Sequence, residues 1–269
     1  MSSHAVPGPR PAPLRPLLHL LGGLLVLAFV AGVAWSLLGV ALRDTTTLPV
    51  EQYAGVRTLD VEVDAGEVVL VPAPEGTRLR VEQKVTRGLW EPERRAARAG
   101  DGALALSSRC PALHNGHCGT DYRIAVPAGT AVSVRTRGGD VVATGVRTEG
   151  PLRLRSSGGR VDVQGAEASA IELSSSAGSV TAVGVSAPVI RASSSAGAVN
   201  VSAIEPPRSL RARSSAGPVT VRVPDAVYAI EASTSAGEVR DQGLRRDPAS
   251  PNRIDASSSA GNVVLGLNR

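Results

Sequence analysis

The sequence Ser-Ala-Gly-Ser-Val at residues 176–180 recurs, with one variable position, at 195–199, 215–219, 235–239 and 259–263. The glycines of these five segments, preceded by Gly139 and Gly159, are separated by 20, 19, 19, 20, 20 and 24 residues. A nearly constant period of this size is typical of a solenoid, in which each repeat packs against its neighbours. The sequence therefore predicts stacked coils of ~20 residues from about residue 130 to the C-terminus.

Apolar and polar residues alternate on both sides of each glycine. Ile171 and Leu173 lie seven and five positions before Gly178, and Val180 and Ala182 lie two and four positions after it. A period of two is typical of strands with one buried face, and no helical period is present in this region. Each coil is therefore expected to contain a strand, a Ser-Ala-Gly corner, a second strand and a return segment. The predicted fold class is an all-β, β-helix-like solenoid.

The glycines are expected to form the corners between these strands. A sharp corner is expected to need a positive φ, which glycine adopts without steric cost, and stacked serine hydroxyls can bond to neighbouring backbone. Serine-rich runs also occur in flexible linkers and glycosylated stalks, but the constant register of the flanking valines favours the solenoid. The predicted structural corner glycines, including one in an earlier coil at 59–70, are Gly66, Gly139, Gly159, Gly178, Gly197, Gly217, Gly237 and Gly261.

The N-terminal part contains the longest apolar run of the chain. Residues 1–16 are rich in Pro, Ser and Ala and are expected to be a disordered cytoplasmic tail. Residues 17–42 are apolar except for His19, Ser36 and four glycines, and the run exceeds the ~20 residues that cross a bilayer. We expect an uncleaved transmembrane α-helix, because a cleavable signal peptide has an apolar region of only ~7–15 residues and a small-residue cleavage site.

Basic residues near this run predict its orientation. Arg10 and Arg15 precede it, whereas Arg43 follows it beside Asp44. Lys and Arg accumulate on the cytoplasmic side, so the balance favours a cytoplasmic N-terminus. The prediction is a single-pass protein of the cell membrane whose C-terminal domain is extracytoplasmic.

The remaining boundaries follow from interruptions of the repeat. Residues 43–56 are expected to be a tether, and residues 57–269 the solenoid domain, with an irregular insertion at about 85–120. Within the insertion, residues 90–98 are expected to form a short helix or an exposed loop, because Pro92 is typical of a helix start. Residues 79–83 are expected to be a further strand, and 241–252 a longer loop.

Cys110 and Cys118 are the only cysteines. Two close cysteines in an extracytoplasmic segment indicate a disulfide. A zinc site with His114 and His117 and a pair of free thiols are the alternatives, but the spacing matches no common zinc finger.

Tandem Ser-Ser-Gly-x-Val-x-Val coils behind one N-terminal span resemble the bacterial putative-adhesin family of extracytoplasmic β-solenoids. The resemblance covers about 57–266, although the family's Asp after the corner glycine is present only at Asp140. It implies a cell-envelope protein, often linked with envelope-stress systems, and it supplies no catalytic residues and no cofactor.

Two functions compete for the outer face of such a solenoid. Asp140, Asp162 and Glu172 are candidates for a polysaccharide-processing enzyme, because two carboxyls about 6.5–9.5 Å apart can cleave a glycosidic bond. The hypothesis we favour is a non-catalytic solenoid that presents a β face to an envelope polymer or protein, since mixed charges on neighbouring coils also serve solubility. A third hypothesis is a partner of an envelope-stress regulator.

Charge and composition bound the possible partners. The net charge is +5, Lys84 is the only lysine, and aromatic residues make up 2% of the chain. Aromatic side chains that could stack on bases are nearly absent, and nucleic acid is therefore not an expected partner. Small arginine clusters at 94–98 and 245–246 are expected to meet anionic wall polymers or lipid headgroups. The sequence contains no acidic ladder for calcium and no phosphate-binding loop, so no metal or cofactor is predicted.

Overall fold

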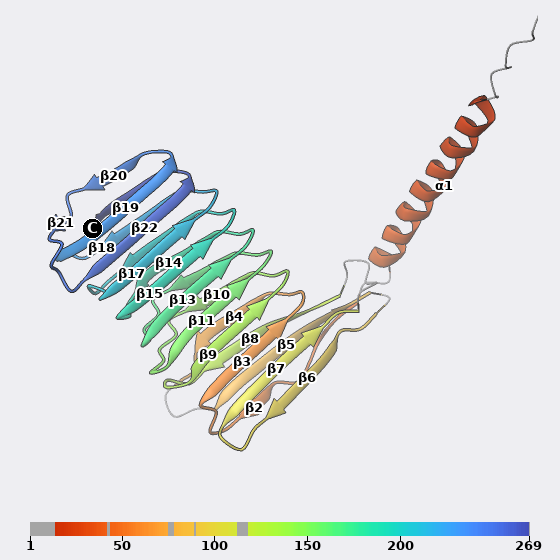
Figure 1. Ribbon diagram of the computed structural model, residues 1–269. Helices are drawn as coiled ribbons and strands as arrows, with labels where there is room; N and C mark the ends of the chain where they lie inside the picture. Colours follow the sequence, from red (N-terminus) through yellow and green to blue (C-terminus); the bar gives the residue numbers. More distant parts are fainter. Residues whose placement is uncertain (1–13, 42–43, 75–77, 89, 112–117, 269) are drawn as a thin grey trace, which may run out of the picture.

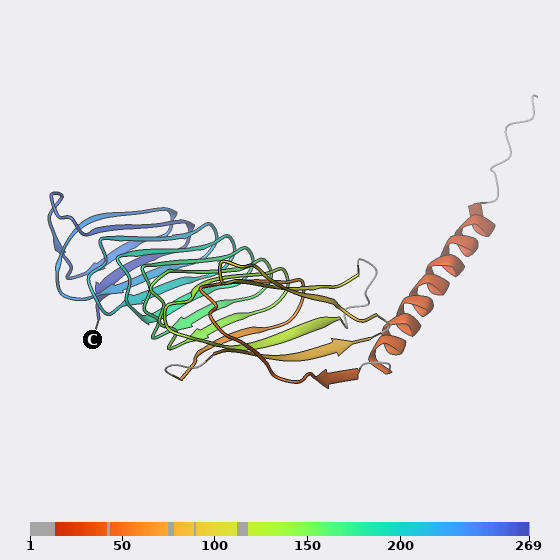
Figure 2. The same ribbon diagram turned by 90° about the horizontal axis from the view of Figure 1, so that it is seen from below.

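The computed structural model describes residues 14–41, 44–74, 78–88, 90–111 and 118–268. Most of the predicted cytoplasmic tail, together with His114 and His117, lies outside the described residues. The described chain forms one helix, α1 (Leu14–Ala41), followed by strands that pair into two long sheets (Figures 1 and 2). The all-β prediction is confirmed for the part that follows the helix.

We call the sheet that contains the strands before the corner glycines the leading sheet. Its strands are β3 (Thr58–Val63), β6 (Glu93–Arg98), β7 (Ala103–Arg109), β9 (Ala131–Thr136), β11 (Pro151–Ser156), β13 (Ala170–Ser175), β15 (Val189–Ser194), β17 (Ser209–Ser214), β19 (Val227–Ala236), β21 (Arg245–Arg246) and β22 (Arg253–Ala260).

The trailing sheet contains the strands after the corners. Its strands are β1 (Asp44–Thr47), β2 (Glu51–Tyr53), β4 (Val68–Pro72), β5 (Leu79–Arg87), β8 (Gly119–Val126), β10 (Val141–Thr144), β12 (Val161–Gln164), β14 (Val180–Val185), β16 (Val199–Ala203), β18 (Val219–Val223), β20 (Val239–Gln242) and β23 (Val263–Leu267).

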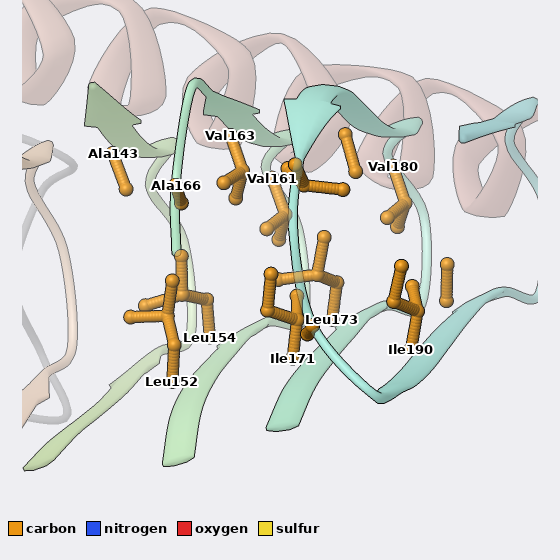
Figure 3. Close-up of a cluster of buried hydrophobic side chains, with 14 of the residues drawn as sticks. Ala143, Leu152, Leu154, Val161, Val163, Ala166, Ile171, Leu173, Val180 and Ile190 are labelled. Carbon is orange, nitrogen blue, oxygen red and sulfur yellow. The ribbon is translucent and has the colours of Figure 1, made fainter. Parts of the chain in front are cut away.

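The core lies between the two sheets. In the central coils, apolar residues at alternate positions of the strands point inward, so that Leu152, Ile171 and Ile190 of the leading sheet face Val161 and Val180 of the trailing sheet (Figure 3). Parallel pairing aligns equivalent residues of neighbouring coils, and the residues of one such column are Val141, Val161, Val180, Val199, Val219 and Val263. All six are fully buried. The predicted inward stacking of these valines is confirmed.

The return segments add a third apolar column that the repeat pattern did not reveal. Val146, Ala166 and Val185 are fully buried, each seven residues after a corner glycine. Short parallel bridges join Arg147 to Glu167 and Glu167 to Ser186 beside this column. The coil therefore closes its interior with a third, narrower side.

The order of the coils in space differs from their order in the sequence at both ends. At the C-terminal end, the last coil (β22–β23) lies between β17–β18 and β19–β20. At the other end, the first coil (β3–β4) lies between β9–β10 and β7–β8. Residues 243–252, most of the predicted long loop, carry the chain from β20 back to β22 and contain the two-residue strand β21.

Two expectations for the N-terminal region are wrong. Residues 93–98 form strand β6 and no helix, because the segment pairs antiparallel with β7 along its whole length. Residues 43–56, expected as a plain tether, contain β1 and β2, which pair antiparallel with β5. The expected strand at 79–83 is confirmed as part of β5.

The apolar side chains of helix α1 are exposed over residues 21–35, where they are described. Leu24, Leu27 and Phe29 are 71–72% exposed. Among the residues that are described, no helix is found that is both long and apolar enough to span a membrane.

Candidate functional site

The corner glycines are required by close packing of successive corners. A Cβ atom added to Gly178 would lie 2.5 Å from the carbonyl carbon of Gly159 and 2.8 Å from the nitrogen of Arg160, and closer still to the oxygen of Gly159. The same clash with backbone occurs at each of the other predicted corner glycines. Because these obstacles are backbone atoms, a larger residue would force neighbouring coils apart.

The conformational reason that we expected is wrong for most corners. Only Gly66 (φ 131°) and Gly237 (φ 157°) among the eight predicted glycines have a positive φ. The left-handed glycines lie instead at the ends of trailing strands, where Gly145, Gly165 and Gly184 have φ values of 62–65°. The second turn of the coil therefore uses the conformational freedom of glycine, and the Ser-Ala-Gly corner uses its small size.

Buried serines connect the corners along the stack. The hydroxyl of Ser175 accepts a hydrogen bond from the N–H of Gly178 in its own coil (2.9 Å) and donates one to the oxygen of Gly159 in the preceding coil (2.7 Å). Equivalent hydroxyls donate to the corner glycine of a neighbouring coil in the stack at Ser156, Ser194, Ser214, Thr234 and Ser258. The expected bonding of stacked serines to neighbouring backbone is confirmed.

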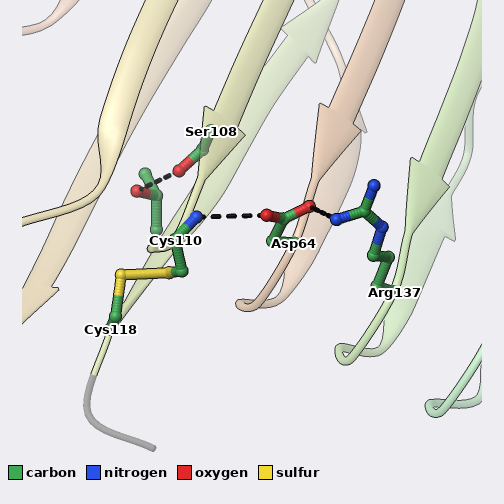
Figure 4. The surroundings of a disulfide bond; sticks show 6 residues. Asp64, Ser108, Cys110, Cys118 and Arg137 are labelled. Atoms are coloured by element: carbon green, nitrogen blue, oxygen red, sulfur yellow. Dashed lines mark hydrogen bonds and ion pairs between the residues drawn. A yellow bond between two sulfur atoms is a disulfide. The ribbon is translucent and has the colours of Figure 1, made fainter. Parts of the chain in front are cut away.

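The cysteines close the corner of the coil formed by β7 and β8. Cys110 and Cys118 form a disulfide with a Cα–Cα distance of 5.9 Å. Figure 4 shows how this corner is tied to the next two coils: the N–H of Cys110 donates to Asp64 (3.1 Å), and Asp64 pairs with Arg137 (2.7 Å). Neither described cysteine is free, so the free-thiol and zinc-thiolate alternatives do not fit the structure. The disulfide holds the end of the solenoid that follows α1.

Glu172 lies apart from the other two candidate catalytic acids. Glu172 lies on the outer face of the leading sheet, between Arg153 (3.3 Å) and Arg191 (3.4 Å). Asp140 and Asp162 lie on the trailing-sheet side of the corner. Asp140 immediately precedes β10, and Asp162 belongs to β12. An inverting hydrolase needs two carboxyls that act on the same bond.

The electrostatics of Asp140 do not suit a general acid. Its carboxylate accepts a hydrogen bond from the backbone N–H of Arg160 (2.7 Å) and pairs with that guanidinium (2.8 Å). The backbone hydrogen bond is the largest cause that lowers the pKa of Asp140, and the side-chain hydrogen bond and charge of Arg160 add to it. A general acid requires a raised pKa, whereas Asp140 stays ionised and joins two coils.

The charged residues of the leading sheet form a surface that the sequence analysis missed. Strands β9, β11, β13, β15 and β17 contribute six arginines and one glutamate. Strands β10, β12, β14, β16 and β18 of the trailing sheet contribute one aspartate and one arginine. We call the arginine-rich surface the basic face, and its arginines are Arg135, Arg153, Arg155, Arg191, Arg211 and Arg213.

The two small arginine clusters noted in the sequence lie at the ends of the leading sheet. Arg94 and Arg95 belong to β6. Arg245 pairs with Asp225 (3.0 Å) and Arg246 with Asp241 (2.6 Å). Across the described residues, no group of three or more His, Cys, Asp or Glu is arranged to hold a metal ion.

These observations define an all-β repeat domain with two mainly parallel sheets, tight glycine corners and short or charged strands at its ends. Residues 112–267 match the family model described as Toastrack DUF4097, and the chain belongs to this family. The resemblance to the putative-adhesin family is thereby confirmed. No curated protein matches the chain.

Several crystal structures are similar in fold. A putative cell adhesion protein from Clostridium sporogenes ATCC 15579 is 12% identical (TM-score 0.42), with 84% of this chain and 100% of that chain covered. A putative adhesin from Bacteroides fragilis NCTC 9343 is 15% identical (TM-score 0.43), with 84% and 97% covered. A putative lipid binding protein from Parabacteroides distasonis ATCC 8503 is 12% identical (TM-score 0.43), with 86% and 98% covered.

Proposed function

We propose that this protein is a membrane-anchored, non-catalytic extracytoplasmic solenoid that presents one sheet face to a partner or polymer of the cell envelope. The observation that carries the proposal is the difference between its faces and its ends. The basic face extends over five parallel strands, whereas the ends consist of short or charged strands such as β1, β6 and β20. Short, charged edge strands oppose pairing with another chain, so the faces are left for recognition.

Anchoring by α1 is supported by the length and composition of the apolar run. Residues 17–42 exceed the ~20 residues needed for a span, and side chains such as Leu25, Val26 and Leu27 are more than 60% exposed on adjacent sides of the helix. Exposed leucines all around a helix are stable in lipid and costly in water. The N-terminus is then cytoplasmic because Arg10 and Arg15 precede the run.

The non-catalytic assignment is supported by the partners of the acids. Arg153 and Arg191 share the carboxylate of Glu172, and Arg160 holds that of Asp140 ionised. Such pairs between coils stabilise the stack and fix the positions of the arginines. A link with envelope-stress systems, implied by the family resemblance, belongs to the same proposal and would act through the anchor or the exposed faces.

Protease accessibility in spheroplasts that carry the full chain tests the location. A C-terminal epitope should be digested from outside, and the protein should stay in the membrane after an alkaline carbonate wash. A protected epitope, or release by carbonate, would contradict the proposal. Alanine replacement of Asp140, Asp162 and Glu172 should leave wall-glycan turnover unchanged, and a loss of turnover would support the enzyme alternative.

A further inference from the structure

The basic face contains a groove that runs across the strands beside the Ser-Ala-Gly corners. It is lined by a column of five register-paired residues in the order Arg155, Ser174, Ser193, Arg213 and Ser257. An adjoining column of outer serines, such as Ser176, lines the same groove, whose volume is about 530 Å³. Because parallel strands are about 4.8 Å apart, the two arginines stand about 14 Å apart with hydroxyl groups between them.

The arginines around this groove outnumber the acids that pair with them. Arg153 and Arg191 share Glu172, and Arg211 and Arg213 share Asp255. Among the described residues, Arg155 forms no ion pair, and its guanidinium donates a hydrogen bond to the hydroxyl of Ser174 (3.0 Å). With Arg253 of β22 included, six arginines face two carboxylates across β11, β13, β15, β17 and β22, which leaves an excess of four positive charges. Arg153, Arg191, Arg211 and Arg213 all have side chains more than 50% exposed.

The shape and chemistry of this surface match a linear polyanion. Guanidinium groups bind carboxylates and phosphates through paired hydrogen bonds, and a charge on nearly every coil gives a ligand several contacts in one line. Serine hydroxyls both donate and accept, so they can bond to sugar hydroxyls between the charged groups. A rigid stack keeps these groups at a fixed spacing, which lowers the entropic cost of binding an extended chain.

A lipid surface is a poorer match for the basic face. Proteins that lie on membranes insert large apolar side chains beside their basic residues. The exposed large apolar residues of the described chain include Val183 and Ile204, which belong to the trailing sheet and to the turn after β16. The outer residues of β11, β13, β15 and β17 are arginine, glutamate and serine, apart from Pro151, Ala170 and Val189 at the starts of three of these strands.

We propose that the groove between Arg155 and Arg213 on the leading sheet binds an anionic polysaccharide of the cell envelope. This inference rests on the proposed function, of which it names the face and the class of ligand. Arg155 and Arg213 hold anionic groups of the glycan at two points along the groove, and the serine columns contact its hydroxyls.

The test uses the full chain in phosphatidylcholine nanodiscs, captured on a sensor, with polygalacturonate as the probe and neutral pullulan as its control. Polygalacturonate should bind and pullulan should not, and the affinity should fall as the salt concentration rises. The double variant Arg155→Gln, Arg213→Gln should bind about tenfold more weakly, because each exposed ion pair contributes up to about 1 kcal/mol and about 1.4 kcal/mol corresponds to a factor of ten. The control Arg147→Gln, Arg222→Gln changes the net charge equally on other faces and should bind like the unmodified protein.

Equal loss in the two double variants would overturn the inference, since it would show attraction by net charge alone. Binding to phosphatidylglycerol vesicles without binding to polygalacturonate would also overturn it and would assign the face to membranes. All four arginines have exposed side chains, so both variants should keep the urea midpoint of the unmodified protein. Failure of the chain to enter nanodiscs would contradict the anchor, whereas absence of polygalacturonate binding by an incorporated chain would contradict this inference alone.

Discussion

The substitution Gly178→Ala tests the packing of the corners. The added Cβ would lie 2.5 Å from the carbonyl carbon of Gly159, which is 0.9 Å inside the 3.4 Å at which ordinary contact begins. The obstacle is backbone, so the two corners must separate by about that amount. The separation would break the hydrogen bond from Ser175 to the oxygen of Gly159 (2.7 Å), which joins the two coils.

The cost of this substitution follows from two terms. Overpacking costs about 1–3 kcal/mol, and the lost hydrogen bond adds about 0.5–1.5 kcal/mol. We therefore expect the free energy of unfolding to fall by about 1.5–4.5 kcal/mol, measured by equilibrium urea unfolding followed through the β-sheet circular dichroism signal.

Gly165→Ala is the matched control, because its Cβ meets nothing within 4 Å while its φ is +62°. This variant should lose only about 1–2 kcal/mol, the cost of a left-handed conformation. Gly165→Asn should be milder still, since Asn tolerates that conformation, whereas Gly178→Asn should be no better than Gly178→Ala. A loss of less than about 1 kcal/mol in Gly178→Ala, or its rescue by Asn, would refute the steric account.

Three further predictions concern single bonds at the corners of the coils. Ser194→Ala removes the hydrogen bond to the oxygen of Gly178 and the bond from the N–H of Gly197. It should lower the free energy of unfolding in urea by about 1–3 kcal/mol, whereas Ser195→Ala at the exposed neighbour should lower it by less than about 0.5 kcal/mol. Reduction of the Cys110–Cys118 disulfide should cost about 2–3 kcal/mol, and hydrogen exchange should accelerate in β7 and β8 while β15 and β17 keep their protection. Because the pKa of Asp140 is lowered in the folded protein, its carboxylate stabilises the fold at a pH above the ordinary carboxyl pKa, and this stability is lost as the pH falls through the lowered pKa. Asp140→Asn should therefore weaken the acid dependence of the urea midpoint. An unchanged dependence would contradict this role.

The coil itself could be predicted from the sequence. Alternation with period two around a recurrent glycine determines which residues point inward, and parallel pairing then aligns Val161 with Val180 and Val199. The glycines could be located by the same pattern, but the reason for them could not. A sequence shows that a residue is small, and only the stacked backbones show that the space for a side chain is absent.

The order of the coils could not be read from the chain. Equivalent strands have nearly the same pattern, so β22 pairs as well in principle with β19 as with β17, and in the structure it lies between them. Segment 93–98 was misread for a related reason. Its Glu, Arg and Ala residues favour a helix locally, and pairing with β7 overrides that preference.

The basic face was missed because its charges are distributed along the sequence. Each coil contributes only one or two outward charges, so the repeats read as mixed columns. Stacking brings Arg155 and Arg213 into one groove, where Arg155 bonds to the hydroxyl of Ser174 and Arg213 pairs with Asp255. Charge patterns of repeat proteins therefore have to be examined by register position across coils.

The central claim is that the first and last coils of the sequence insert between other coils. Short or charged strands such as β6 and β20 then form the ends of the sheets, and the sheet faces remain for recognition. Oxidative cross-linking of cysteine pairs at positions 213, 233 and 257 tests this claim most directly, because Ser257 is the register partner of both Arg213 and Ser233. Adjacent strands place these Cα atoms within the range of about 4.4–6.8 Å that a disulfide requires, and strands two apart do not. The account predicts cross-links for the pairs 213–257 and 233–257 and none for 213–233; a cross-link at 213–233 without one at 213–257 would contradict it.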